Sequence, residues 1–292
     1  HIFARWSSAI GLRRAAFLLL FAASVSIAAG SARAQQPTLL NDPSFREEAK
    51  VGVERLYNME YAVADSIFTA IAERHPKHPA GPFMQALTLW WQILTNLADT
   101  SHDDAFYAAM DEVIRRADAI LEDDADHLDA LYLKGAALGF RSRLRANRSN
   151  WFRAVIDGKR AMNYVLEVAA MEPEGEDYYF GRGVYDYYAA AAPERYSIAK
   201  PVMWLLPDGD KERGIRYLRH TVEHGFFVRT EAAYFLLQIY YMYEDDYERS
   251  RHYAEWLRSH HPQNSYFHLL EARVFLHWNE RAEARTVLAE IA

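Results

Sequence analysis

The stretch DYERSRHYAEWLRSHHP, residues 246–262, decides the predicted fold because its pattern recurs later in the chain. Ser250, Ala254 and Leu257 place one small and two apolar residues on a single helical face. The same spacing returns 34 residues later, at Ala284, Leu288 and Ile291. A helix pair repeated at this period cannot bury its apolar face alone and must stack on its neighbours. The period therefore predicts an all-α fold, a right-handed α-solenoid of about six antiparallel helix pairs.

The rest of the chain fits the same two-helix template. Near the front, Gly52, Ala64, Phe68 and Pro76 occupy its close-packing, small, large-apolar and terminating positions. An insertion near 194–207 interrupts the fourth pair, and no linker is long enough to divide residues 35–292 into two domains. The predicted pairs are 45–58 with 61–74, 81–96 with 103–122, 127–144 with 151–171, 176–193 with 211–224, 228–243 with 246–259, and 265–278 with 281–291.

Four residues are predicted to cap helices. Ser44, followed by Glu47, is typical of a capping box, and Asp126 and Asp210 precede later helices. Gly225 follows His224 and is predicted to end its helix in the left-handed conformation.

Residues 1–34 have the pattern of a secretory signal peptide. Arg13 and Arg14 precede an apolar run, Ala15–Ala29, and Ala32–Ala34 has the small residues of a cleavage site. The run is shorter than the roughly 20 residues that span a bilayer, although an uncleaved anchor is the alternative. We expect export to the periplasm or cell envelope of a Gram-negative-type bacterium. We also expect the chain to be a piece of a longer reading frame, truncated at its C-terminus.

Composition excludes several classes of protein. With no cysteine, the chain can form neither a disulfide nor a lipid anchor at the cleavage point. Loss of residues 1–34 would remove four arginines and leave 29 basic and 40 acidic residues, a net charge of −11. So acidic a chain is a poor general binder of nucleic acid.

The tyrosine-rich stretch EDYYFGRGVYDYYAAAAP, residues 176–193, is the candidate binding helix. First helices of stacked pairs line the concave wall, and tyrosine gives a large contact area at small entropic cost. The alternative is that these rings only pack against neighbouring helices. Two candidate stripes contain Tyr178, Arg182 and Tyr185, and Phe180, Val184 and Tyr187, and the sequence leaves open which one faces the groove.

A basic segment flanks Trp151 and Phe152. It could hold phosphate, lipid headgroups or an acidic partner, or it could simply be a charged connection between helices. The candidate residues of this anionic-partner patch are Arg141, Arg143, Arg145, Arg148 and Arg153.

The only metal-like motif is HTVEH, residues 220–224, which matches the H-x-x-E-H pattern of a zinc-peptidase class. Ile215, Leu218 and Val222 mark the buried stripe of this helix, which turns both histidines to water and leaves no dry cleft for zinc. We therefore predict no enzyme, no catalytic residue, no metal and no cofactor.

The helix-pair pattern resembles the tetratricopeptide repeat (TPR) superfamily over essentially all of residues 35–292. The segments YYFGRGVYDYY, DGDKERGIRYL and HPQNSYFHLLEARVF are also distantly similar to the tetratricopeptide repeat protein thirty-nine family. The resemblance implies a non-catalytic scaffold that binds a protein or peptide of unknown identity, without nucleic acid or a stable membrane span. The alternative is a small-molecule or glycan-binding protein that uses the tyrosine-rich helix.

Overall fold

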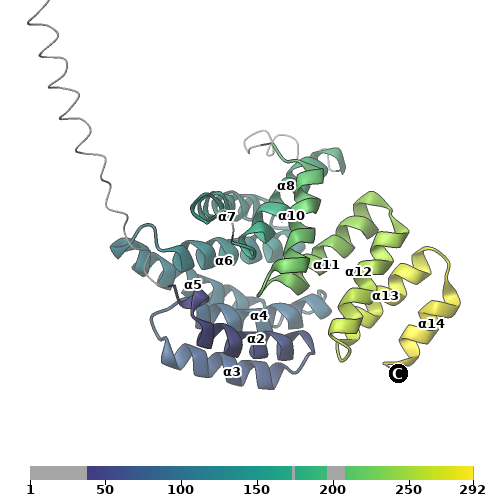
Figure 1. Cartoon of the computed structure of the whole chain (residues 1–292), viewed down its shortest axis with the longest axis horizontal. Coiled ribbons are helices and arrows are strands. Elements are labelled where there is room, and N and C mark those ends of the chain that lie inside the picture. Colours follow the sequence, from purple (N-terminus) through teal and green to yellow (C-terminus); the bar gives the residue numbers. More distant parts are fainter. Residues whose placement is uncertain (1–37, 173–174, 196–207, 292) are drawn as a thin grey trace, which may run out of the picture. The chain divides into compact units, whose positions relative to one another are not determined.

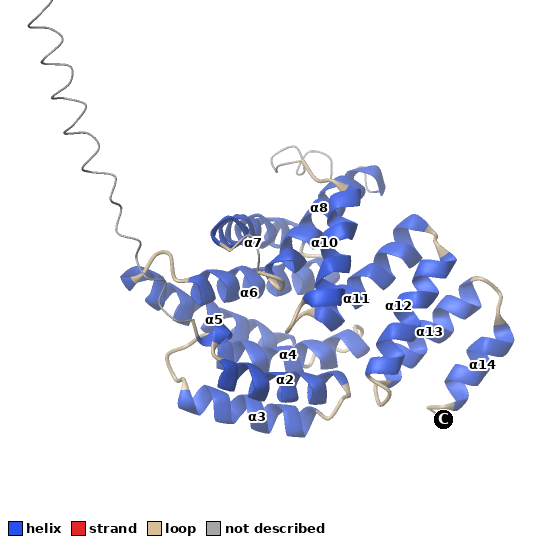
Figure 2. Ribbon diagram, in the orientation of Figure 1, coloured by secondary structure: helices blue, strands red, loops and turns tan. Residues whose placement is uncertain are grey.

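The computed structural model describes residues 38–172, 175–195 and 208–291, and these contain helices and turns but no strand (Figure 2). Residues 38–292 form one compact unit. The predicted signal peptide and most of the predicted insertion at 194–207 lie outside the described residues.

Helices in the described part pair consecutively along the chain (Figure 1). Their bounds agree with the predicted pairs to within a few residues, except that α11 ends early, in a π-helical turn, η3 (Tyr240–Glu244). The pairs are α2 (Pro43–Tyr57) with α3 (Tyr61–Arg74), α4 (Ala80–Thr95) with α5 (Asp103–Asp123), α6 (Leu128–Asn147) with α7 (Trp151–Met171), α8 (Tyr178–Arg195) with α10 (Lys211–His224), α11 (Arg229–Ile239) with α12 (Tyr247–His260), and α13 (Ser265–His277) with α14 (Arg281–Ala289). The all-α solenoid is therefore confirmed.

Small residues let the paired helices approach closely. A Cβ atom on Gly52 of α2 would lie 2.4 Å from the ring of Phe68 on α3, and Ala64, Ser250 and Ala284 are fully or almost fully buried at the equivalent small positions. The template positions read from the sequence are thus the positions at which the helices touch.

Two predicted N-caps are wrong, and Gly225 ends α10 as predicted but in another conformation. Helix α2 begins two residues early: Asp42 is the N-cap, and its side chain accepts a hydrogen bond from the Phe45 amide, at 2.8 Å. Proline at the first helical position has a φ already suited to the helix, so Pro43 extends α2 past Ser44. His127, not Asp126, caps α6, and Gly225 has a φ of −58°, outside the left-handed region. Asp210 caps α10 as predicted.

The first pair also contacts the last two pairs. Asn264, between α12 and α13, donates a buried hydrogen bond of 2.7 Å to the carbonyl oxygen of Tyr57 at the end of α2. The Tyr57 ring lies 5.2 Å from Trp91 of α4 and 5.1 Å from His261, measured between ring centroids. An ordinary solenoid repeat touches only its neighbours along the chain, whereas here residues some 207 positions apart are joined.

Candidate functional site

Two groups of aromatic rings lie on the first helices of the second to fifth pairs, and together we call them the aromatic wall. Phe83 and Phe140 lie 5.9 Å apart, Phe180 and Phe235 lie 5.5 Å apart, and Tyr188 lies 6.1 Å from Phe235, all between ring centroids. These five rings come from α4, α6, α8 and α11, and each is only partly buried. The wall therefore presents large, rigid apolar surfaces from four separate helices.

Arg143 of α6 lies at the centre of the aromatic wall. Its guanidinium carbon is 4.7 Å from the ring centroid of Phe235, 4.9 Å from Trp90 and 5.4 Å from Tyr234. Such contacts stabilise a cation by the quadrupole of each ring. Among the described residues, no carboxylate lies within ion-pair distance of Arg143. The wall thus holds a cation that could accept a carboxylate from a ligand.

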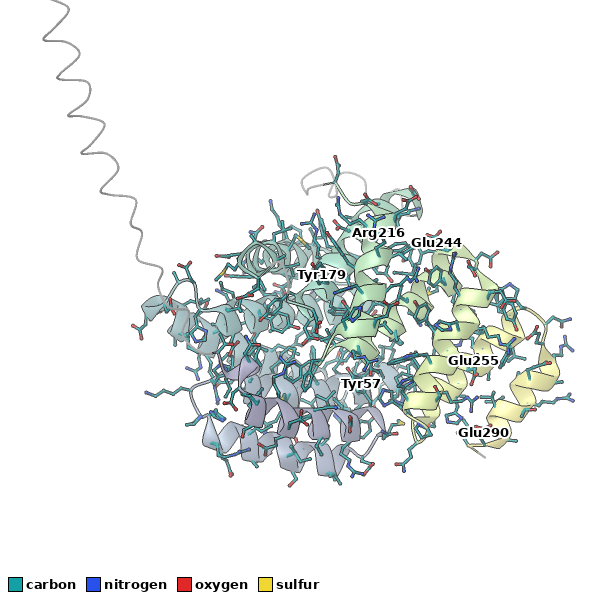
Figure 3. All side chains as sticks on the ribbon, viewed as in Figure 1. Tyr57, Tyr179, Arg216, Glu244, Glu255 and Glu290 are labelled. Atoms are coloured by element: carbon teal, nitrogen blue, oxygen red, sulfur yellow. The ribbon has the colours of Figure 1, made fainter. Side chains whose placement is uncertain are left out.

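A buried carboxylate, Glu231 of α11, lies behind the wall. It is 3% exposed, and neither of its oxygens has a hydrogen-bond partner in the described part of the chain. Burial raises the pKa of Glu231, whereas the charge of Arg143 and the nearby Trp91 and Tyr57 oppose the rise. Figure 3 shows Tyr57 beside the C-terminal helices, where its carbonyl oxygen accepts the hydrogen bond from Asn264.

The two predicted stripes of α8 have different neighbours. Phe180 packs on Phe235 of α11, and Val184 packs against the main core. Tyr187 is fully buried, and its hydroxyl donates a 2.6 Å hydrogen bond to Glu244 of η3. This stripe faces the first helix of the next pair.

The other stripe faces elsewhere. Tyr185 is almost buried against Met162 of α7, and Arg182 pairs with the buried Asp186 at 3.0 Å. Tyr178 contacts Tyr132 of α6, at 5.0 Å between centroids. The structure places only Phe180 of the six predicted partner-binding residues in the aromatic wall; Tyr188 of the same helix, which is also in the wall, belongs to neither predicted stripe.

The predicted anionic-partner patch is divided among different environments. Arg141 and Arg145 both pair with Asp157, which is 1% exposed, and Arg141 also pairs with Asp111. Arg148 binds Asp103 and the carbonyl oxygens of Leu97 and Asp99. Arg143 belongs to the aromatic wall, and Arg153 is exposed on α7. Three of the five arginines thus hold neighbouring helices together.

The HTVEH motif lies on α10, where the His220 and His224 rings are in tilted contact with centroids 4.6 Å apart. The side chains of His224 and Glu223 are both about half exposed. Within the described residues, no group of three histidine, aspartate or glutamate side chains is arranged to hold a metal ion.

A cleft of about 490 Å³ opens between α5, α6 and α7. Charged residues of both signs line it, and two of them, Lys134 and Asp118, pair at 2.5 Å. The sequence contains no signal for this cleft, because its walls come from three helices whose relative placement is set by tertiary packing.

Sequence reasoning also missed the convergence of Trp90, Tyr234 and Phe235 on Arg143. The available signal was weak: each residue lies on a predicted first helix, but the face of that helix is set by long-range packing.

The structure is that of a TPR-like helical repeat protein. Three features define this class: the helix pairing, the 34-residue offset between the starts of α12 and α14, and the shared face of the first helices.

Comparisons with known proteins give a likeness among solved structures. No protein-family model matches the chain, and no curated protein matches it. Among solved structures, the chain is similar to TTC0263, a thermophilic TPR protein in Thermus thermophilus, with 13% sequence identity and a TM-score of 0.45. The match covers 79% of this chain and 98% of that chain.

Proposed function

We propose that the chain is a non-catalytic repeat scaffold that binds an extended peptide segment of a protein partner across the aromatic wall. The observation that carries the proposal is that rings from α4 and α11 surround Arg143, which has no ion-pair partner among the described residues. Phenylalanine and tyrosine rings offer large contact areas that lose little entropy on binding. The ligand is therefore a peptide with apolar or aromatic side chains and one carboxylate that reaches Arg143.

One variant of the TPR fold binds the C-terminal tail of a chaperone through its terminal carboxylate, and that binding mode does not fit this surface. That mode needs lysine, asparagine and arginine on the first helices, and the fifth pair presents Ala232, Phe235, Ile239 and Met242 at the equivalent positions. We propose that the partner is a protein of the periplasm or cell envelope, on the basis of the signal-peptide pattern in residues 1–34. Within the described residues, none of the helices is long and apolar enough to cross a bilayer.

The test is selection of a binding peptide followed by titration. A random-peptide library is panned against the full chain, and a selected peptide is titrated by fluorescence polarisation. We expect Arg143→Met and Phe235→Ala each to weaken binding about tenfold or more, as hot-spot residues do. Phe235 is a better choice than Tyr187, because Tyr187 is fully buried and its removal would disturb folding.

Trp256→Ala is the matched control. Trp256 is a partly buried aromatic residue on α12, a second helix, and its ring stacks on His260 with centroids 3.9 Å apart. It should leave peptide affinity unchanged. Equal affinity for wild type, Arg143→Met and Phe235→Ala would overturn the proposal. A thermal shift with a sugar or metabolite that Phe235→Ala abolishes, without any peptide binding, would favour the small-molecule alternative.

A further inference from the structure

The first two turns of α7 carry an exposed apolar face, which we call the α7 apolar face: Trp151, Phe152, Val155 and Ile156. Phe152 is 78% exposed and Trp151 is 64% exposed. In the described part of the chain, the other strongly exposed large hydrophobic residues are aliphatic or methionine and are scattered singly; they are Val51, Val63, Leu97, Met242, Leu269, Leu276 and Ile291. Two adjacent exposed aromatic rings therefore need a physical reason.

Helical geometry gathers the four residues on one side. Their spacing, i, i+1, i+4 and i+5, keeps them within less than half of the helix circumference. Ala154, Asp157 and Ala161 lie on the other side and are buried in the fold. The apolar face thus points away from the packed side of α7.

The exposed charged residues on the first turns of α7 are all cations. Arg153, Lys159 and Arg160 are exposed, and the only acidic residue of α7 before Glu167 is the buried Asp157. Arg141 and Arg145 already bind Asp157, Arg141 also binds Asp111, and Arg148 binds Asp103. The exposed surface here is locally basic, although the whole chain has a net charge of −7.

We propose that the α7 apolar face docks the protein on an anionic lipid surface. Tryptophan and phenylalanine insert at the boundary between headgroups and acyl chains, while lysine and arginine bind the anionic headgroups. The two rings protrude rather than line a groove, which suits a deformable bilayer better than a rigid protein surface. A second copy fits less well, because pairing two α7 apolar faces would bring their cations together. This docking is independent of peptide binding at the aromatic wall.

Vesicle co-sedimentation tests the proposal with the full chain. We expect binding to vesicles of phosphatidylglycerol and phosphatidylcholine, much weaker binding to phosphatidylcholine alone, and loss of binding at high salt. Trp151→Ser combined with Phe152→Ser should weaken binding at least about tenfold, because two large apolar side chains no longer insert. Arg153→Glu combined with Lys159→Glu should abolish the preference for anionic vesicles.

The matched control is Leu269→Ser combined with Leu276→Ser, which removes two exposed apolar side chains from α13. It should bind vesicles as wild type does, and circular dichroism should show that all variants remain folded. Unchanged vesicle binding by Trp151→Ser with Phe152→Ser would overturn the proposal and assign binding to residues 1–34. A dimer in light scattering that this variant abolishes, without vesicle binding, would assign the face to a second copy. Binding to an acidic protein but to no vesicle would also overturn it.

Discussion

His261 is a buried histidine whose protonation should weaken the fold. Its Nε2 atom lies 2.8 Å from the hydroxyl oxygen of Thr230, and the residue is 6% exposed. Burial, with a smaller contribution from the charge of His260, lowers the pKa of His261 to about 4. In the unfolded chain the histidine has an ordinary pKa near 6.5. Between pH 6.5 and 4, His261 is therefore protonated in the unfolded chain but neutral in the folded chain.

The free energy of unfolding should accordingly fall as pH drops through this window, by up to about 3 kcal/mol from His261. Above pH 6.5 the contribution of His261 is fully present. His261→Gln should flatten the fall between pH 6.5 and 4 in urea titrations. The exposed His252→Gln is the control and should keep the wild-type slope. An identical slope in His261→Gln would contradict the prediction.

Glu231 changes the free energy of unfolding with pH in the opposite direction to His261. The effect of His261 must therefore be measured as a difference between wild type and a variant. Burial raises its folded-state pKa above the ordinary 4.5, so the folded chain holds a proton that the unfolded chain releases. Its stabilising contribution is present at low pH and is lost as pH rises through the folded-state pKa. The difference between His261→Gln and wild type cancels this shared background.

At the scale of helices, two glycines fix the crossing of α8 and α10. A Cβ atom on Gly214 would lie 2.5 Å from the backbone nitrogen of Tyr187, and one on Gly183 would lie 3.0 Å from the carbonyl oxygen of Gly214. We expect Gly214→Ala to lower the free energy of unfolding by about 1–3 kcal/mol, because backbone atoms must separate. Thermal or urea unfolding measures this change.

Gly139→Ala in α6 is the matched control. It is also a helical glycine, but a Cβ atom there would meet nothing within 4 Å. Alanine should therefore stabilise the protein by up to about 1 kcal/mol through helix propensity alone. If both substitutions changed the free energy of unfolding by the same amount, close packing at Gly214 would not be what makes that position intolerant of a Cβ atom.

Local patterns predicted these elements well for a physical reason. Apolar periodicity and the small residue at Gly183 depend on contacts within a helix pair, which the sequence shows directly. Caps were less predictable, because proline lets α2 start at Pro43 with Asp42 as its N-cap, although Ser44 has the better local pattern. Arg143 joined the aromatic wall rather than a basic patch because rings of α4 and α11 reach it, and no local pattern encodes their position.

At the scale of the whole molecule, the contact between the first pair and the last two pairs changes how the solenoid should unfold. Repeat arrays with contacts only between neighbours can lose their terminal repeats first. The Tyr57 ring lies 5.1 Å from the His261 ring, measured between centroids, and Asn264 donates a hydrogen bond to the Tyr57 carbonyl oxygen, so the terminal pair α2–α3 is held at two places. Unfolding of α2–α3 should therefore be coupled to that of α11–α13.

Asn264→Asp tests this coupling, because it separates two roles of one side chain. The Asn264 Oδ1 atom caps α13 by accepting hydrogen bonds from the Tyr266 and Phe267 amides, at 3.0 and 3.2 Å, whereas its amide nitrogen donates to Tyr57. Aspartate keeps the acceptor but removes the donor and leaves a buried carbonyl unpaired, which costs about 1–3 kcal/mol. We expect faster amide hydrogen exchange in α2 and α3, with α6 and α7 unchanged.

Gln263→Ala, at the adjacent exposed position, should leave exchange in α2 and α3 as in wild type. Asn264→Ala should add loss of the cap, about 1 kcal/mol, and should loosen α13 as well. Exchange that rises uniformly over all helices in Asn264→Asp would mean that the bond contributes only to global stability. Exchange confined to α2 and α3 would establish that this one hydrogen bond ties the first helix pair to the last two.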